Sequence, residues 1–144
     1  MQNYDSEKAA RVWQRVRNEE PVPVELSALP GFATAENELA ELLRRLSRQY
    51  PAAGALSTEC RRHATVIRGI CALGGIPCRT APFTGDIPRE LLRSCYGKTL
   101  QLLREYEARR EHPEYGCAFQ ALAEKKRAQA CLLLELAGRG IPTK

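Results

Sequence analysis

One pair of side chains in this sequence has types and a spacing that could bind a metal ion on one face of a helix. Cys60 and His63 are three residues apart, and Lys126 and Gln129 share this spacing but not the residue types of metal ligands. Residues three apart on an α-helix point to the same side. Thiolate and imidazole groups are ligands of zinc and iron, and the carboxylate of Glu36 could add an oxygen ligand. One interpretation is therefore a small zinc or iron site formed by Glu36, Cys60 and His63.

The same residues have a second interpretation, as polar members of a helical core. His63 lies on an otherwise apolar stripe, where a histidine usually forms hydrogen bonds within the core. Cys60 has apolar neighbours, and a free cysteine packs like a small hydrophobic residue. Both interpretations require helices around these residues. Apolar side chains do recur every three or four positions along most of the chain.

This periodicity predicts four long helices and no strand. The helices cover residues 34–50, 57–74, 88–111 and 114–137, and a connection rich in Gly and Pro covers 74–88. Four helices of this length with one longer central connection are typical of an antiparallel four-helix bundle. The predicted fold class is therefore all-α.

A polar or soft side chain interrupts the inward stripe of each predicted helix. The interruptions are Glu36 in the first helix, Cys60 and His63 in the second, Thr99 in the third, and Lys126 and Gln129 in the fourth. Burying a polar group costs free energy unless the group is paired. We therefore expect these side chains to meet one another at a similar depth in the bundle.

The first 33 residues are predicted to form a unit separate from the bundle. Residues 5–18 have apolar positions at helical spacing, and prolines at 21, 23 and 30 follow them. Proline interrupts a helix because it lacks the backbone N–H. We expect a short helix and a tether over residues 1–33 and the bundle over residues 34–144, with the docking place of the short helix left open.

Composition argues against several classes of function. The 22 basic and 17 acidic residues give a net charge of +5. Because the basic residues are spread over every predicted helix and do not form one patch, no nucleic-acid partner is expected. No apolar run is long enough to span a membrane, and no signal peptide is visible. The six cysteines include no CxxC pair. We expect free thiols in a cytoplasmic protein.

Four stretches of the sequence resemble the ferritin-like, rubrerythrin-like proteins of bacteria. They are residues 59–70 (ECRRHATVIRGI), 91–100 (LLRSCYGKTL), 113–116 (PEYG) and 122–138 (LAEKKRAQACLLLELAG). The likeness extends over about residues 34–140. It implies a ferritin-like antiparallel four-helix bundle. Members of that family hold two irons between the helices and use them in peroxide reduction, oxygen chemistry or iron oxidation.

The resemblance also implies that most of the iron ligands have been replaced. Glu36 matches the family's first-helix glutamate, and His63 matches its second-helix histidine. Cys60 and Thr99 stand where the second and third helices carry glutamates, and Lys126 and Gln129 replace the glutamate and histidine of the fourth helix. One glutamate, one histidine and one cysteine cannot neutralise two hard cations. We expect Lys126 to pair with Glu36, its ammonium supplying the charge that a metal would have supplied. The alternative is that Lys126 turns outward to solvent beside Lys125 and Arg127.

Two hypotheses about function follow from these observations. The first is a non-catalytic structural or interaction protein without a cofactor, which forms homo-oligomers or binds an unknown protein partner. The alternative is a metal-binding protein or oxidoreductase with a rebuilt zinc or iron centre around Glu36, Cys60 and His63. The metal content of the purified protein distinguishes the two.

Overall fold

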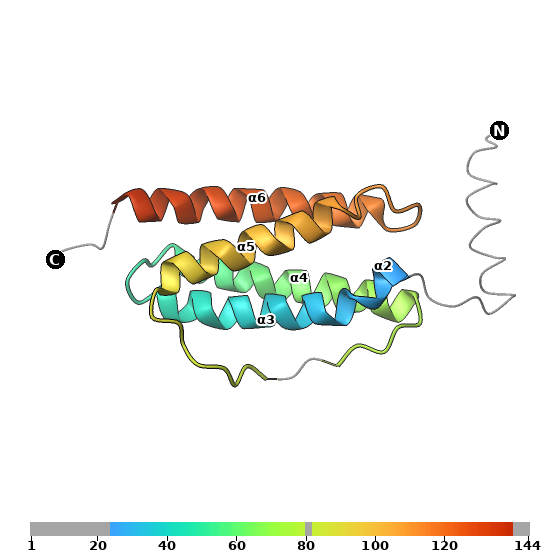
Figure 1. The fold of residues 1–144 in the computed structure, drawn as a ribbon, viewed down its shortest axis with the longest axis horizontal. Helices are drawn as coiled ribbons and strands as arrows, with labels where there is room; N and C mark the ends of the chain where they lie inside the picture. Colours follow the sequence, from blue (N-terminus) through green and yellow to red (C-terminus); the bar gives the residue numbers. More distant parts are fainter. Residues whose placement is uncertain (1–23, 80–81, 140–144) are drawn as a thin grey trace, which may run out of the picture.

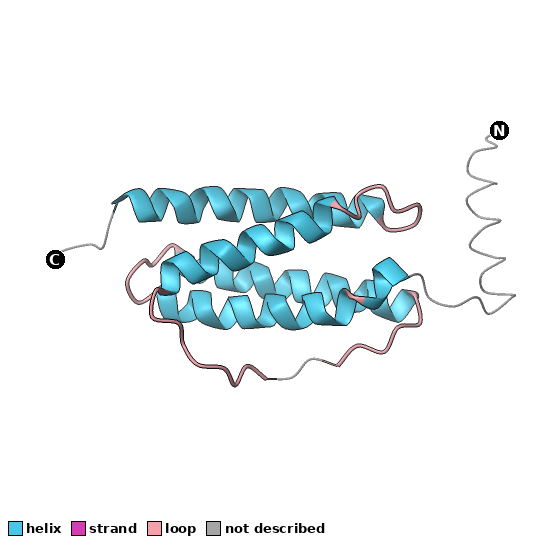
Figure 2. Ribbon diagram, viewed as in Figure 1, coloured by secondary structure: helices cyan, strands magenta, loops and turns pink. Residues whose placement is uncertain are grey.

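The computed structural model describes residues 24–79 and 82–139, and within them it is all-α (Figure 1). The helices are α2 (Val24–Ser27), α3 (Leu29–Leu46), α4 (Ala53–Leu73), α5 (Leu91–Glu107) and α6 (Gly116–Arg139). These described residues contain no strand (Figure 2). For the described residues, the prediction of an all-α fold with four long helices is therefore confirmed. The short helix predicted over residues 5–18 lies outside the described residues.

The four long helices form two antiparallel hairpins that pack on each other. α3 packs along α4, and α5 packs along α6, while α3 also contacts α5 and α4 more sparsely contacts α6. α5 begins at the end of the bundle where α3 finishes, and the described parts of the connection from α4 lie beside the bundle (Figure 1). With these four neighbouring pairs, α3 and α6 lie diagonally across the bundle, as do α4 and α5.

The start of α3 differs from the prediction of a helix beginning at Thr34. α3 begins at Leu29 and has Pro30 in its first turn. A proline is tolerated there because the first backbone N–H groups of a helix have no partner within the helix. The predicted break at Pro30–Gly31 is therefore wrong. Leu26 and Leu29 are buried in the core, so residues predicted to belong to the tether pack with the bundle.

The other helix ends differ from the predicted ends by a few residues. α4 begins at Ala53 instead of residue 57, and α5 begins at Leu91 instead of directly after Pro88. α5 also ends at Glu107, earlier than predicted, and α6 begins at Gly116. α6 continues through Gly138 to Arg139, two residues beyond the predicted end at residue 137. Glycine lowers helix stability by only about 1 kcal/mol, so a packed helix can continue through one.

The predicted inward stripes form the core of the bundle. Every stripe residue is buried except Leu92, which is half-buried. The stripes are Glu36, Leu39, Leu43, Leu46 and Tyr50 for the first helix; Leu56, Cys60, His63, Ile67 and Ile70 for the second; Leu92, Cys95, Thr99, Leu102 and Tyr106 for the third; and Phe119, Leu122, Lys126, Gln129, Leu133 and Leu136 for the fourth. All six cysteines are free thiols, as predicted. None of the described helices combines the length and apolar character needed to cross a membrane.

Candidate functional site

Glu36 and Lys126 form an ion pair in the centre of the bundle. Lys126 on α6 donates from Nζ to Oε1 of Glu36 on α3 over 2.6 Å, and neither side chain is exposed to solvent. The two residues lie on the inward stripes of diagonally opposed helices. This contact confirms the predicted pairing of Lys126 with Glu36.

Lys126 uses three different side chains as hydrogen-bond acceptors. Besides Glu36, its Nζ donates to Oε1 of Gln129 over 2.8 Å and to Sγ of Cys60 over 3.3 Å. An ammonium group has three N–H donors. Each donor therefore has one acceptor. These hydrogen bonds offset the free-energy cost of removing the ammonium group from water.

The second carboxylate oxygen of Glu36 accepts a hydrogen bond from Tyr106. The Tyr106 hydroxyl on α5 donates to Oε2 over 2.5 Å. The ring of Tyr106 is held by Phe119, stacked at a centroid distance of 6.5 Å, and by the edge-on ring of Phe32 at 6.0 Å. Both oxygens of the buried carboxylate are therefore paired, one by a cation and one by a neutral donor.

Tyr106 belongs to this cluster although its position in the sequence did not predict it. Tyr106 lies on the inward stripe of α5, seven residues after Thr99, and the pattern shows only a core aromatic residue. Its hydroxyl group could have indicated a polar partner in the core, because a buried tyrosine usually needs a hydrogen-bond partner. Glu36 is the partner that the bundle provides.

His63 approaches the cluster without forming a hydrogen bond. Its Nδ1 lies 3.6 Å from Oε2 of Glu36, which is longer than a hydrogen bond allows. Within residues 24–79 and 82–139, this buried nitrogen has no hydrogen-bond partner. His63 is therefore the only member of the cluster with an unsatisfied buried polar atom.

The side of the cluster nearest the surface is formed by Gln129 and Glu59. Gln129 donates from Nε2 to Oε1 of Glu59 over 2.8 Å, while its own Oε1 accepts from Lys126 and, at 3.8 Å, from the thiol of Cys60. Lys125 lies 3.8 Å from the other oxygen of Glu59. Gln129 thus connects the buried ion pair to charges at the surface.

Thr99 is buried but forms its hydrogen bond elsewhere. Its hydroxyl donates to the backbone carbonyl of Cys95 over 2.8 Å, one turn earlier in α5. A threonine in a helix often forms this local bond. Of the six positions expected to meet, the structure therefore brings five together, namely Glu36, Cys60, His63, Lys126 and Gln129, while Thr99 is satisfied within its own helix.

The local environment fixes the charge of each acid in the cluster. Burial by itself would raise the pKa of Glu36, but the nearby His63 and the positive charge of Lys126 outweigh burial and lower it. Burial raises the pKa of the Cys60 thiol to about 12. Burial, together with the negative charge of Glu36, also raises the pKa of the Tyr106 hydroxyl. At neutral pH the carboxylate is therefore ionised, and the thiol and phenol are neutral.

The donor set does not fit a di-iron centre, because Lys126 Nζ lies among the side chains that would have to bind the metal. It is within 3.3 Å of both Glu36 and Cys60. No three His, Cys, Asp or Glu side chains in the described part of the chain come together in an arrangement that could hold a metal ion. A cation at this place would also be repelled by the ammonium.

Comparisons with known proteins do not connect this chain to a family. A scan against protein-family models and searches of curated proteins and solved structures found no match.

Proposed function

We propose that this chain is a ferritin-like, rubrerythrin-like bundle of bacterial type that acts as a structural or interaction protein without catalytic activity. The single long connection between two helical hairpins supports the ferritin-like part, because such a crossover characterises that class of bundle. The fold alone does not specify an activity. The polar cluster in the core carries the functional part of the proposal.

The observation that carries the proposal is the position of Lys126 Nζ between Glu36, Cys60 and Gln129. All three contacts are 3.3 Å or shorter. The ammonium balances the charge of the only carboxylate among the cluster's fully buried side chains, and its three donors are all used. The ammonium therefore has no donor left for a substrate, which supports a structural role for the cluster. On this proposal the bundle folds and binds its partners independently of any metal supply.

Metal analysis of the full-length chain, purified without added metal, tests the proposal. Wild type and the double variant Glu36→Ala/His63→Ala are compared, and a chelator is added to the wild type while its melting temperature is followed. The proposal expects no stoichiometric metal in either protein and no effect of the chelator. About two irons per chain, lost in the double variant, would contradict it and indicate a di-iron oxidoreductase.

A second candidate function is a metal-binding protein or oxidoreductase with one zinc or iron bound near Glu36, Cys60 and His63. The observation that favours it is the unsatisfied Nδ1 of buried His63. On this reading Lys126 turns away from the cluster when the metal binds. About one zinc or iron per chain, lost in the double variant and removed by the chelator with a fall in melting temperature, would support this candidate.

A further inference from the structure

The outer face of α6 carries small and apolar side chains over its C-terminal half, with Glu135 beside them. Leu134 is 58% exposed. Ala128, Cys131, Leu132, Leu134 and Glu135 line a shallow depression along the helix surface. The opposite face of the same stretch packs Ala130, Leu133 and Leu136 into the bundle. Exposed apolar side chains that lie together on a surface are a candidate site for a protein partner.

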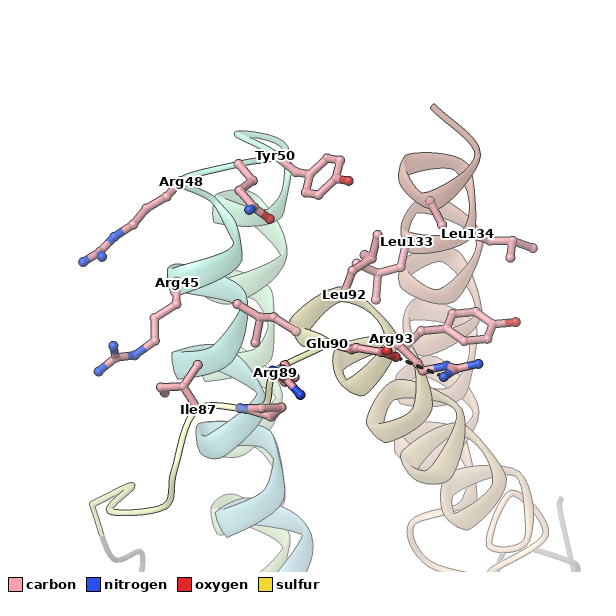
Figure 3. Close-up of a pocket in the computed structure, with 15 residues that line it drawn as sticks. Arg45, Arg48, Tyr50, Ile87, Arg89, Glu90, Leu92, Arg93, Leu133 and Leu134 are labelled. Carbon is pink, nitrogen blue, oxygen red and sulfur yellow. Dashed lines mark hydrogen bonds and ion pairs between the residues drawn. The ribbon is translucent and has the colours of Figure 1, made fainter. Parts of the chain in front are cut away.

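This face continues into a groove at one end of the bundle (Figure 3). The groove has a volume of about 800 Å³ and is formed by the end of α3, the start of α5 and the end of α6. Figure 3 shows Leu133 and Leu134 projecting to different sides of α6, while Arg45 and Arg48 extend away from the groove. The exposed apolar surface therefore extends from the groove around Leu134 onto the outer face of α6.

We propose that a second copy of this chain docks on this face, with the two α6 helices antiparallel and a two-fold axis passing near Cys131. The docking surface, called the α6 stripe below, is the set of exposed residues at helical spacing around that cysteine: Glu124, Arg127, Ala128, Cys131, Leu134, Glu135 and Gly138. Positions three, four and seven residues from Cys131 lie on one face of the helix. Two identical faces related by a two-fold axis must be self-complementary.

The charges of the α6 stripe favour this arrangement. In an antiparallel pair centred on Cys131, residues equally far from Cys131 face each other. Arg127 then faces Glu135 of the second copy, and the small Ala128 faces Leu134 of the second copy. A parallel pair would instead place Arg127 against Arg127 and Glu135 against Glu135. Like charges at such short range oppose association.

Arg127 and Glu135 also form ion pairs within their own chain, and these pairs do not prevent contacts with a second copy. Arg127 contacts Glu107, and Glu135 lies 3.4 Å from Arg139. The side chains of Arg127 and Glu135 are 55% and 57% exposed. Ion pairs at the surface are weak, so these side chains can turn towards a partner at little cost.

This inference names one partner for the proposed interaction protein and rests on that proposed function. Its failure is distinguishable from failure of the proposed function. A chain that is monomeric and free of metal would overturn the inference alone. A dimer that contains a metal essential for its stability would overturn the proposed function alone.

Sedimentation of the full-length chain over a range of concentrations is the first test. We expect a monomer–dimer equilibrium in which Leu134→Glu raises the dissociation constant roughly 30-fold, because it buries a charge at the centre of the interface. Leu73→Glu is the matched control, since Leu73 is 79% exposed at the end of α4 and outside the α6 stripe. It should leave the dissociation constant unchanged. A monomer at every concentration, or equal effects of both variants, would overturn the inference.

Charge reversal tests the orientation of the two helices. Arg127→Glu and Glu135→Arg should each weaken the dimer, and the double variant should restore it, because reversal of both charges rebuilds the same pairs with opposite sign. An antiparallel pair predicts this rescue. A double variant weaker than either single variant would overturn the antiparallel arrangement.

Oxidation with diamide tests the position of the axis. Two Cys131 thiols near the axis should form an intermolecular disulfide, with diamide taking up their two hydrogens. Cys117 is also exposed on α6 and serves as the control. The Cys117→Ser variant should form covalent dimers, and the Cys131→Ser variant should not. Covalent dimers of Cys131→Ser but not of Cys117→Ser would overturn the inference. A monomer in which another segment of the chain protects Cys131 from maleimide would also overturn it.

Discussion

Lys126 Nζ lies 2.6 Å from Glu36 Oε1, although the two residues are 90 positions apart and belong to diagonally opposed helices. The pair therefore crosses the interior of the bundle. A buried ion pair gains little net stability, because the cost of removing both charges from water offsets most of their attraction. We expect its larger effect to be on the alignment of the helices, since a shift of α6 along α3 would separate the charges.

Removal of Lys126 alone should destabilise the bundle. Lys126→Met keeps most of the side-chain volume but leaves Glu36 buried with only Tyr106 as a donor. Breaking a buried pair from one side typically costs about 3–5 kcal/mol. Urea denaturation at neutral pH measures the difference, and an unchanged free energy of unfolding would contradict the role assigned to the pair.

Lys98→Met is the control for that measurement. Lys98 also lies near a glutamate, with Nζ 3.6 Å from Oε1 of Glu38, but both side chains are more than a third exposed. An exposed ion pair contributes about 0–1 kcal/mol. The control variant should therefore unfold at nearly the wild-type urea concentration.

The ion pair also predicts how stability depends on pH. The pKa of Glu36 in the folded protein lies below its ordinary value of 4.5, so the unfolded chain binds more protons on acidification. The stabilisation from the ionised carboxylate is fully present above the unfolded pKa and is lost as the pH falls through the folded pKa. Glu36→Gln lacks this contribution. The difference in unfolding free energy between wild type and Glu36→Gln should therefore shrink on acidification from about pH 6 to about pH 3, and a difference that is constant over this range would contradict the assignment.

The buried cysteines should react slowly with thiol reagents. Burial raises the pKa of both Cys60 and Cys95 to about 12, and only the thiolate is an effective nucleophile. Maleimide at about pH 8 should label the exposed Cys117 within minutes, whereas Cys60 and Cys95 should react only when the chain unfolds. Mass spectrometry of peptides after short and long exposure measures the rates. Rapid labelling of Cys60 in the folded protein would show that the cluster is open to solvent.

Gly116 should not tolerate a side chain. At the start of α6, a Cβ at this position would collide with the backbone carbonyl of Arg110. Gly116→Ala should therefore destabilise by about 1–3 kcal/mol, as overpacking does elsewhere. Gly97→Ala is the control, because a Cβ there meets nothing within 4 Å in the middle of α5. It should stabilise by about 0.5–1 kcal/mol. Thermal melts of the two variants should shift in opposite directions.

The helix ends show where a sequence pattern is weakest. Thr34 is a good cap residue and Pro30–Gly31 a good break, yet α3 begins at Leu29. Local preferences at a helix end amount to about 1 kcal/mol. Burial of Leu26 and Leu29 in the core exceeds this preference, because fully burying a leucine contributes about 1.5–3 kcal/mol.

The all-α class, the four inward stripes and a contact of Lys126 with Glu36 could be predicted from the sequence, because a period of 3.6 indicates which residues share a face and a buried charge needs an opposite one. It took the packing of the helices to show that Tyr106 donates to Glu36, that Thr99 bonds within its own helix and that His63 Nδ1 has no partner in the described chain. These outcomes depend on distances of a few tenths of an ångström between different helices. A hydrogen bond has a sharp distance limit, and the order of residues along one helix does not specify its distance from another.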